Sequence, residues 1–587
     1  MASVGLIAAV SRWRIIAWAL VAWACWPASS ALADTLQVDI TGVSGRLHRQ
    51  LVEHLVALQG AQRTTISSSR ILAMHRLAPA SLSEALEALG YYTASVKPTL
   101  VQQGRAWVAT YAIVRGPPVR VSTVEIDLLG DAQTDPAWAD RVARFPLAVG
   151  EVLVHASYED GKQALEQRLA DRGYFDARFT HAEVRVERRT QQARIRLIID
   201  SGRRYRFGEL RWPATVLTPG FLGRYVTFSP GDFYRSGDLL DLQTRLVDSN
   251  YFSSVVVEPL RDLAQAEQVP VGVELIPRKA HQYSLGLGLG TDTGPRGRAS
   301  WQRPTVNSQG HQAEADLRVS ALYSSLLGLY TIPLRSAYTD SVAFSAKMDT
   351  EDTGVAQSHK IQFGVAHLTR RYGWHETVGL AYAVEGYEVA DSSAVAGLLI
   401  PSARWVRVWS DDPLYTKDGV RLALGLRGAA AQLLSRVSFV QFRGEAKYVH
   451  AFGGARLILR SEVGALATGD FDHLPVSERF FAGGDSSVRG FRFESLGPRN
   501  AAGKVTGGHY LMTGGVEVEQ HLYGSWSGAV FSDFGNALDS FSDPLQYSAG
   551  FGVRWLSPVG LVRLDLANGL SDPDHPWRVS VSAGPDL

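Results

Sequence analysis

The chain has 587 residues, more than one hydrophobic core usually organises, which indicates several domains. Its 59 Lys+Arg nearly balance its 58 Asp+Glu, and a formal net charge of +1 provides no overall field that would gather nucleic acid. We therefore expect no nucleic-acid partner, and function has to come from local sites.

The N-terminus has the layout of a cleavable export signal. Arg12 and Arg14 precede an apolar run over residues 15–26, and small residues follow as far as Ala33. We expect a signal peptide over residues 1–33 rather than a membrane anchor, because about a dozen apolar residues are too few to cross about 30 Å of hydrocarbon. The single cysteine, Cys25, lies inside this segment. Disulfides, thiol catalysis and cysteine–metal sites are thus not expected in the mature chain.

The front half repeats one pattern: a helix closed by Gly or Asn, two aromatic residues, and then a strand. Its three landmarks are Gly90-Tyr91-Tyr92, Gly173-Tyr174-Phe175 and Asn250-Tyr251-Phe252. They recur at intervals of roughly 80 residues, which suits small domains rather than a solenoid.

Local signals place the elements of each copy. We expect helices over residues 81–89 and 157–172, with N-terminal capping by Ser81 with Glu84 and by Ser157 with Asp160, and a third helix capped by Ser236. Leucines at helical spacing mark the buried faces, namely Leu82, Leu86, Leu89, Leu165, Leu169, Leu239, Leu242 and Leu246. The following strands are expected over residues 107–114, 193–200 and 269–276.

This order of helix, Gly-Tyr-aromatic, strand and basic junction resembles polypeptide-transport-associated (POTRA) domains. The resemblance implies three α+β domains, over residues 34–117, 118–203 and 204–279. Such a domain offers sheet edges with unpaired N–H and C=O groups to extended peptides. A rigid spacer is the alternative, and the sequence leaves both readings open.

From residue 281 onward the pattern changes to a period of two. Leucines and one tyrosine alternate with glycine and serine in the first such segment, at Tyr283, Leu285, Leu287 and Leu289. Similar segments occupy residues 313–319, 420–426, 456–463 and 561–566. No run of about 18 apolar residues occurs after the signal. Membrane insertion would therefore require a closed sheet, because hydrocarbon leaves no water for open strand edges. At roughly 10 residues per tilted strand, residues 280–587 have room for an antiparallel transmembrane β-barrel of about 16 strands.

One motif is more specific than any other in the chain. Residues 483–492 read GGDSSVRGFR and resemble the loop-six signature of the BamA/TamA superfamily of outer-membrane insertases, which two-partner-secretion translocators share. Residues 531–535, residues 557–560 in the expected penultimate strand, and the chain end at 583–587 also resemble the family. Three POTRA domains ahead of a barrel is the number associated with TamA, the translocation and assembly module subunit.

The resemblance assigns roles to residues of this loop. Arg489 is expected to meet carboxylates on the inner barrel wall, with Asp533 as its partner and Glu517 as a second candidate, although Glu519 shares the parity of Glu517. A guanidinium suits this role because its planar fork of donors matches carboxylate oxygens, which lysine does not reproduce. In the remainder of the Val488–Phe491 motif, Gly490 would permit a tight turn and Phe491 would wedge the loop.

The resemblance also implies a mechanism at a lateral seam. A weakly paired seam would lie between the first strand, with its weakening glycines, and the last strand, with Trp577, Val579 and Val581 facing outward. Clients such as autotransporters would enter by edge pairing and leave into outer-membrane lipid. The barrel would lie in the bacterial outer membrane with the POTRA domains in the periplasm, where a TamB-like, inner-membrane-anchored protein would be the partner.

No enzyme, cofactor or metal site is expected. The 15 histidines are scattered, and the Gly484-Asp485-Ser486 echo of an esterase motif lacks a βαβ context. Three alternatives remain at this point. A two-partner-secretion translocator pore normally has two soluble repeats and a plug helix, BamA normally has five repeats, and a soluble β-rich enzyme would need no detergent for extraction.

Overall fold

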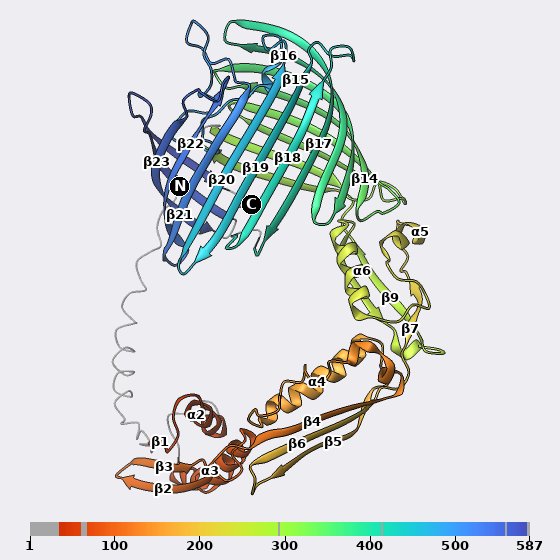
Figure 1. The fold of residues 1–587 in the computed structure, drawn as a ribbon, viewed down its shortest axis with the longest axis vertical. Helices are drawn as coiled ribbons and strands as arrows, with labels where there is room; N and C mark the ends of the chain where they lie inside the picture. Colours follow the sequence, from red (N-terminus) through yellow and green to blue (C-terminus); the bar gives the residue numbers. More distant parts are fainter. Residues whose placement is uncertain (1–34, 60–66, 291–293, 413–414, 558–559, 584–587) are drawn as a thin grey trace, which may run out of the picture. The chain divides into compact units, whose positions relative to one another are not determined.

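The computed structural model describes residues 35–59, 67–290, 294–412, 415–557 and 560–583. The expected signal peptide, residues 1–33, lies outside them. The chain forms two compact units, one within residues 1–207, 231–236 and 265–268 and the other within the remaining residues (Figure 1). Within the described ranges, no helix has the length and apolar character needed to cross a membrane.

Three small sheets precede the large one, and in each of them the strand latest in sequence is central, in the orders β1-β3-β2, β4-β6-β5 and β7-β9-β8. The strands are β1 (Thr35–Thr41), β2 (Ser95–Gln103), β3 (Ala106–Val114), β4 (Arg120–Leu129), β5 (Arg178–Glu187), β6 (Gln192–Asp200), β7 (Arg206–Arg211), β8 (Phe252–Pro259) and β9 (Gln268–Pro277). The helices are α2 (Gly45–Gln59), α3 (Ser68–Ala88), α4 (His155–Asp171), α5 (Pro219–Leu222) and α6 (Ser236–Asp248), with short 3-10 turns η1 to η4 between them. These are the α+β modules expected from the sequence.

Helix boundaries differ from the sequence expectation in each of the three copies. In the third, α6 already includes Ser236, so Ser236 is not its N-cap. Helix α3 begins at Ser68 rather than Ser81 and continues through Pro79. Its buried residues Ile71, Ala78, Leu82 and Leu86 form one continuous apolar face, so packing sustains the helix across the proline. Ser81 is therefore not a cap.

The second helix also starts earlier than expected. Helix α4 begins at His155 with Val154 as its N-cap, which places Ser157 inside the helix. The C-terminal landmarks are as expected: Gly90, Gly173 and Asn250 have φ values of +92°, +90° and +66°. These left-handed conformations end the helices before each aromatic pair.

The large sheet has 16 strands, each hydrogen-bonded to its neighbours in sequence (Figure 1). All its ladders are antiparallel. The strands are β10 (Gln282–Gly290), β11 (Gly294–Arg303), β12 (Gln312–Ser320), β13 (Tyr323–Pro333), β14 (Asp340–Asp352), β15 (Ala356–Arg371), β16 (Trp374–Val389), β17 (Ser392–Ser410), β18 (Gly419–Ala429), β19 (Phe439–Phe452), β20 (Ala455–Thr468), β21 (Tyr510–Tyr523), β22 (Trp526–Leu538), β23 (Gln546–Ser557), β24 (Gly560–Gly569) and β25 (Trp577–Ala583). The expected barrel of about 16 strands is confirmed.

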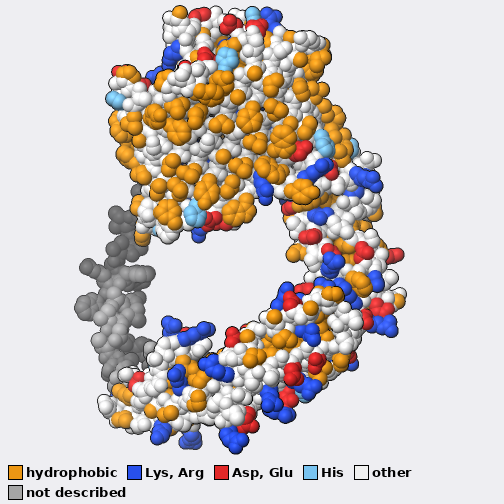
Figure 2. Space-filling view, in the orientation of Figure 1, with side chains coloured by type: hydrophobic (Ala, Val, Ile, Leu, Met, Phe, Trp, Pro, Cys, Tyr) orange, Lys and Arg blue, Asp and Glu red, His pale blue; other side chains and the backbone are white. Residues whose placement is uncertain are grey.

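The two faces of the barrel wall differ in polarity. In β15, Ile361, Phe363 and Val365 are exposed on the outside, whereas Lys360 is buried on the lumen side. Figure 2 shows hydrophobic side chains spread over the visible outer face of the barrel, with charged groups gathered towards its ends. An apolar exterior and a polar lumen are what lipid contact requires.

Within the second unit, the third module is fixed to a turn of the barrel. Residues 304–311 connect β11 to β12, and the Tyr251 hydroxyl donates a hydrogen bond to the Gly310 carbonyl at 2.5 Å. A Cβ on Gly310 would lie 2.2 Å from the Phe221 ring, so only glycine fits there. The Thr218 N–H also donates to the Ser308 carbonyl at 3.1 Å. The third module and this hairpin are thus packed together directly.

Candidate functional site

Loop six, residues 469–509 between β20 and β21, packs inside the barrel. Val488 is 0% exposed and Phe491 is 7% exposed. Both belong to an apolar cluster that joins the loop to wall residues from several strands, including Leu398, Phe439, Leu466, Leu511 and Ala537. Phe491 is therefore packed between the loop and the wall.

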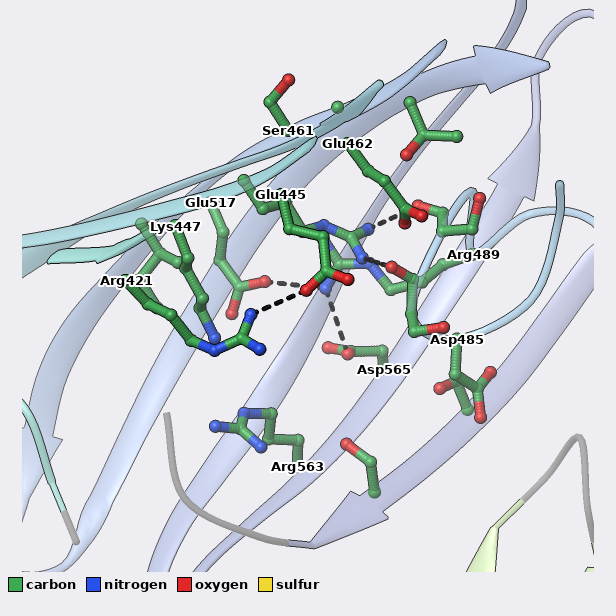
Figure 3. A pocket seen from close by; sticks show the side chains of 18 of the residues that line it. Arg421, Glu445, Lys447, Ser461, Glu462, Asp485, Arg489, Glu517, Arg563 and Asp565 are labelled. Atoms are coloured by element: carbon green, nitrogen blue, oxygen red, sulfur yellow. Dashed lines mark hydrogen bonds and ion pairs between the residues drawn. The ribbon is translucent and has the colours of Figure 1, made fainter. Parts of the chain in front are cut away.

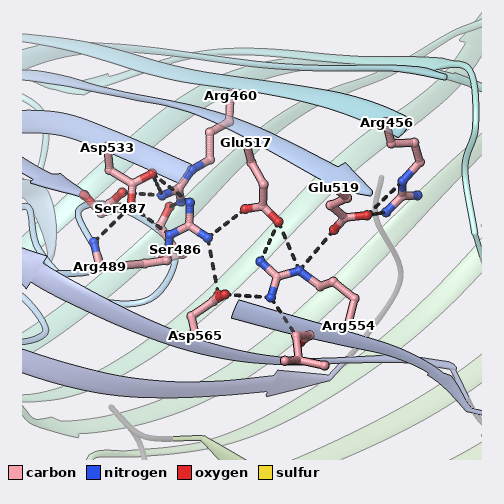
Figure 4. Close-up of polar contacts among 11 residues, drawn as sticks. Arg456, Arg460, Ser486, Ser487, Arg489, Glu517, Glu519, Asp533, Arg554 and Asp565 are labelled. Carbon is pink, nitrogen blue, oxygen red and sulfur yellow. Dashed lines mark hydrogen bonds and ion pairs between the residues drawn. The ribbon is translucent and has the colours of Figure 1, made fainter. Parts of the chain in front are cut away.

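Arg489 points from this loop into the C-terminal part of the wall (Figure 4). Its Nε and Nη2 donate to the two carboxylate oxygens of Asp533 in β22, at 2.8 and 2.9 Å. Its Nη1 donates to Glu517 in β21 at 2.7 Å and to Asp565 in β24 at 3.3 Å. The guanidinium also lies 3.3 Å from the ring centroid of Phe531. The structure thus brings together Arg489 and both of the acids proposed for it, and adds a third.

A second arginine extends the contact along the wall. Arg554 in β23 donates to Glu517 through Nη2 at 2.5 Å and to Asp565 through Nη1 at 2.6 Å. Its Nε also lies 3.0 Å from Glu519, which faces the same lumen as Glu517. Arg554 therefore links β21 to β24 underneath Arg489.

Two further arginines, both from β20, close the network. Arg460 contacts Asp533 at 2.7 Å and donates to the Ser486 and Ser487 carbonyls of loop six at 2.5 and 2.7 Å. Arg456 donates from Nε to Glu519 at 2.9 Å.

We call this set the arginine latch: Arg456, Arg460, Arg489, Arg554, Glu517, Glu519, Asp533 and Asp565. The set has equal numbers of guanidinium and carboxylate groups and crosses five consecutive strands, β20 to β24. Equal opposite charges at these distances let every buried ion find a partner, which is the condition for a buried ion network to persist. The latch therefore holds loop six to the wall without leaving a net buried charge.

Gly490 has a different role from the one expected. It is not among the residues with positive φ, so no left-handed turn requires it. Instead, a Cβ at this position would lie 2.7 Å from Cβ of Ser548, 2.8 Å from N of Gly569 and 2.9 Å from C of Asn568. Glycine is needed because the loop backbone packs directly against β23 and β24.

A cavity of about 640 Å³ lies beside the latch (Figure 3). Half of its lining residues are charged, of both signs, and they include the latch residues Arg489, Glu517 and Asp565. On one side it reaches residues 580–583 of β25, the last strand. The latch and the end of the sheet thus border the same space.

The edges of the sheet are β10 and β25. Among the residues that the structure describes, no strand ladder joins these two. Tyr283, Leu285 and Leu287 in β10 are 75%, 86% and 96% exposed, against 39% for the outward Val365 in β15. β25 lies near this flank of β10, but among the described residues it forms no hydrogen-bonded ladder with it.

The remaining seam residues lie as follows. In β25, Trp577 and Val579 are exposed outward and Val581 is half-buried. Leu289 falls within β10, but its side chain lies outside the described part of the chain.

Sequence reasoning missed Arg456, Arg460 and Arg554 as partners. All three alternate with apolar residues in their strands. Their positions in this alternation predict that they face the lumen, but they do not reveal which acid each arginine contacts. The motif at residues 557–560 is also displaced from the expected penultimate strand: Ser557 ends β23 and Gly560 begins β24, with 558–559 outside the described residues.

Comparisons with known proteins agree with this architecture. Residues 306–582 match the Omp85 superfamily domain, and residues 37–115 match the POTRA domain TamA domain 1. The outer membrane protein assembly factor BamA of Nitratidesulfovibrio vulgaris is 22% identical over 385 residues, which cover 62% of this chain and 48% of that protein. The chain thus matches about half the length of this relative.

The solved structure of a BamA shows the same fold. BamA from Haemophilus ducreyi lacking POTRA domains 1–3 superposes with a TM-score of 0.65 at 14% identity, covering 80% of this chain and all of that one. CdiB from Acinetobacter baumannii has a TM-score of 0.45 at 14% identity, covering 88% of this chain and 98% of that one. With both ends of the architecture matched, the chain belongs to the BamA/TamA superfamily, in which periplasmic POTRA domains precede a barrel in the outer membrane.

Proposed function

We propose that this protein is a TamA-like assembly factor that inserts or translocates autotransporters and other β-barrel clients across the seam between β10 and β25. It performs no enzymatic step. A client strand pairs with an exposed edge, and the growing client sheet leaves laterally into lipid. The observation that carries the proposal is the pair of unjoined edge strands beside a lumen whose loop is latched.

Strand length supports a weak seam. β10 has 9 residues and β25 has 7, whereas β17, about midway round the sheet, has 19. Short strands offer few ladder hydrogen bonds, and β10 carries three glycines that add no side-chain packing. The wall is therefore weakest where the two ends of the sheet meet.

The filled lumen favours a lateral route over a conducting pore. Loop six contributes Val488 and Phe491 to an apolar cluster inside the barrel, and its Arg489 is 5% exposed. A two-partner-secretion translocator would need this loop to leave the lumen before a polypeptide could pass. Conductance of the purified barrel in planar bilayers separates the two functions, since the lateral route predicts no stable open channel.

We also infer a periplasmic partner for the POTRA modules, a TamB-like protein anchored in the inner membrane. The three small sheets end in edge strands, such as β2 and β5, that have neighbours on one side only. Such edges fit extended segments of a partner or client.

The test is a disulfide across the seam. Cysteines at Leu287 and Val579 should stop client insertion when oxidised, and reductant should restore it, because a closed seam cannot accept a strand. A matched pair at Val365 and Leu380, which face each other across β15 and β16, should form a disulfide without this effect. The readout is protease-resistant insertion of an autotransporter barrel into proteoliposomes. Undiminished insertion with the seam bond formed contradicts the lateral route.

A further inference from the structure

Loop six has a second attachment, on a different part of the wall from the arginine latch. This attachment is at the short turn η5 (Val476–Glu478) of the loop, where Glu478 is 0% exposed. Lys360 of β15 approaches Glu478 at 3.0 Å, and Arg427 of β18 approaches its other oxygen at 3.0 Å. Gln441 of β19 donates to the Glu478 carbonyl at 2.8 Å. Three wall strands therefore converge on Glu478, two of them at its buried carboxylate and one at its backbone carbonyl.

The neighbouring residue adds contacts to a fourth strand. The Ser477 hydroxyl donates to Glu385 of β16 at 2.5 Å, and the Ser477 N–H donates to the same carboxylate at 3.2 Å. Glu385 is 1% exposed and also lies 3.7 Å from Lys360. The two acids, Glu385 and Glu478, are thus matched by the two bases, Lys360 and Arg427.

This second attachment has the opposite polarity to the first. At the arginine latch, the loop supplies a cation to acids on the wall. At η5, the loop supplies an anion, Glu478, to cations on the wall. The chain between Glu478 and Arg489 is apolar where it is most buried, with Phe480, Ala482 and Val488 at 3%, 2% and 0% exposure. The loop is therefore tied at two points, with a packed segment between them.

We propose that Glu478 is a positioning residue that ties loop six to strands β15, β18 and β19 and so holds the segment between Glu478 and Arg489 packed against the wall. The loop acts as a strap between two parts of the wall. Release at Glu478 frees the segment before Arg489, while Arg489 keeps its own partners. This proposal concerns the loop alone and does not depend on the proposed insertase activity.

The test uses a reporter inside the strap. The chain has one cysteine, Cys25, in the expected signal. Ala482→Cys then gives a single thiol in the buried segment, whose reaction with a water-soluble maleimide is followed in the full-length protein in proteoliposomes. Adding Glu478→Gln should speed labelling about tenfold or more, because removing one partner of a buried ion pair shifts a closed–open equilibrium by at least that factor.

Two further variants make the result decisive. Glu445→Gln changes another lumen acid, whose ion pairs are with arginines of the wall, such as Arg421 at 2.9 Å, and should leave the labelling rate unchanged. The double variant Lys360→Met/Glu478→Gln removes one charge of each sign, so it keeps the buried set neutral while it loses the strap contact. It should label as fast as Glu478→Gln.

Heat-modifiable migration establishes first that each variant forms a barrel. Slow labelling in either folded variant overturns the proposal. So does failure of the neutral double variant to form a barrel, because the contact would then be needed for folding rather than for holding a folded loop.

Discussion

The POTRA modules and the barrel are built with opposite polarity. The second module has a core of apolar side chains such as Ile195 and Leu197, both at most 1% exposed, and its charges lie on the surface. In the barrel, apolar residues cover the outer face, and the ion pairs lie inside together with the apolar cluster that holds loop six. Among the described residues, no Lys, Arg, Asp or Glu of the modules is buried, whereas the barrel buries seven of the eight residues of the arginine latch, with Arg460 22% exposed. Each part presents to its solvent, water or lipid, the side chains that this solvent accepts.

The largest loss of stability is expected when the ion pairs inside the barrel are broken. Arg489→Ala removes the cation shared by three acids and should destabilise the folded barrel by about 3–5 kcal/mol, since the remaining charges are buried and no longer balanced. The temperature of the heat-modifiable gel shift measures this loss. Arg421→Ala, at a half-buried pair on the same lumen, serves as the control with an expected loss of about 1 kcal/mol or less. Equal losses of stability for Arg489→Ala and Arg421→Ala would show that the arginine latch stabilises the barrel no more than a half-buried ion pair does.

An arginine at an outward-facing position should destabilise the barrel but not the POTRA modules. Phe363, 62% exposed near the middle of β15, faces lipid, and Phe363→Arg should cost about 2–4 kcal/mol. Leu77 in α3 is 68% exposed, and Leu77→Arg should change stability by less than about 0.5 kcal/mol because that surface faces water. Urea titration of the protein in lipid vesicles measures both. Tolerance of arginine at Phe363 would contradict the lipid-facing assignment of β15.

A smaller effect is expected at Gly490. Gly490→Ala forces a methyl group against the backbone of β24, which should cost about 1–3 kcal/mol and weaken the seating of loop six. Gly469, in the same loop, has no atom within 4 Å of an added Cβ, so Gly469→Ala is the matched control. The same gel-shift assay compares the two. A Gly490→Ala barrel as stable as the control would mean that the loop backbone has room to move away from the wall.

The smallest effect concerns an ion pair of the second module. Burial alone would raise the pKa of Asp135, but hydrogen bonds from the Ala137 N–H, Arg172 and Tyr174 lower the pKa below its ordinary value. A carboxyl with a lowered folded-state pKa stabilises the fold above its unfolded pKa of about 3.9, and that contribution is lost as pH falls through the folded pKa. We expect about 1–2 kcal/mol at neutral pH.

Hydrogen–deuterium exchange of residues 155–171 in the full chain measures this contribution. Samples are equilibrated across acidic to neutral pH and pulsed at one common pH. Asp135→Asn should reduce protection at neutral pH and match the unmodified protein at the acidic end. Asp127→Asn, at an exposed position of β4, should have no effect. A pH-independent difference for Asp135→Asn would contradict the role of its charge.

Sequence alone predicts the barrel well because its strands record their two faces as alternation, as in β20 and β24. The Arg489–Asp533 contact followed from a motif. Arg554 and Arg460 could not be placed as partners, because the register between strands decides which charges meet and single strands do not encode it. Helix α3 was predicted too short because Pro79 and Ser81 imitate a helix start, while the apolar face that overrides them spans both sides of the proline.

The reach of the arginine latch has a consequence for how the barrel assembles. Arg489 needs acids from β21, β22 and β24 at once, and Arg554 must arrive from β23 between two of them. A slip of one residue in any of these strands would turn its charge outward into lipid. With Arg460 of β20 included, loop six can make all of its latch contacts only when five strands are in register, so its seated position depends on the alignment of the last third of the polypeptide.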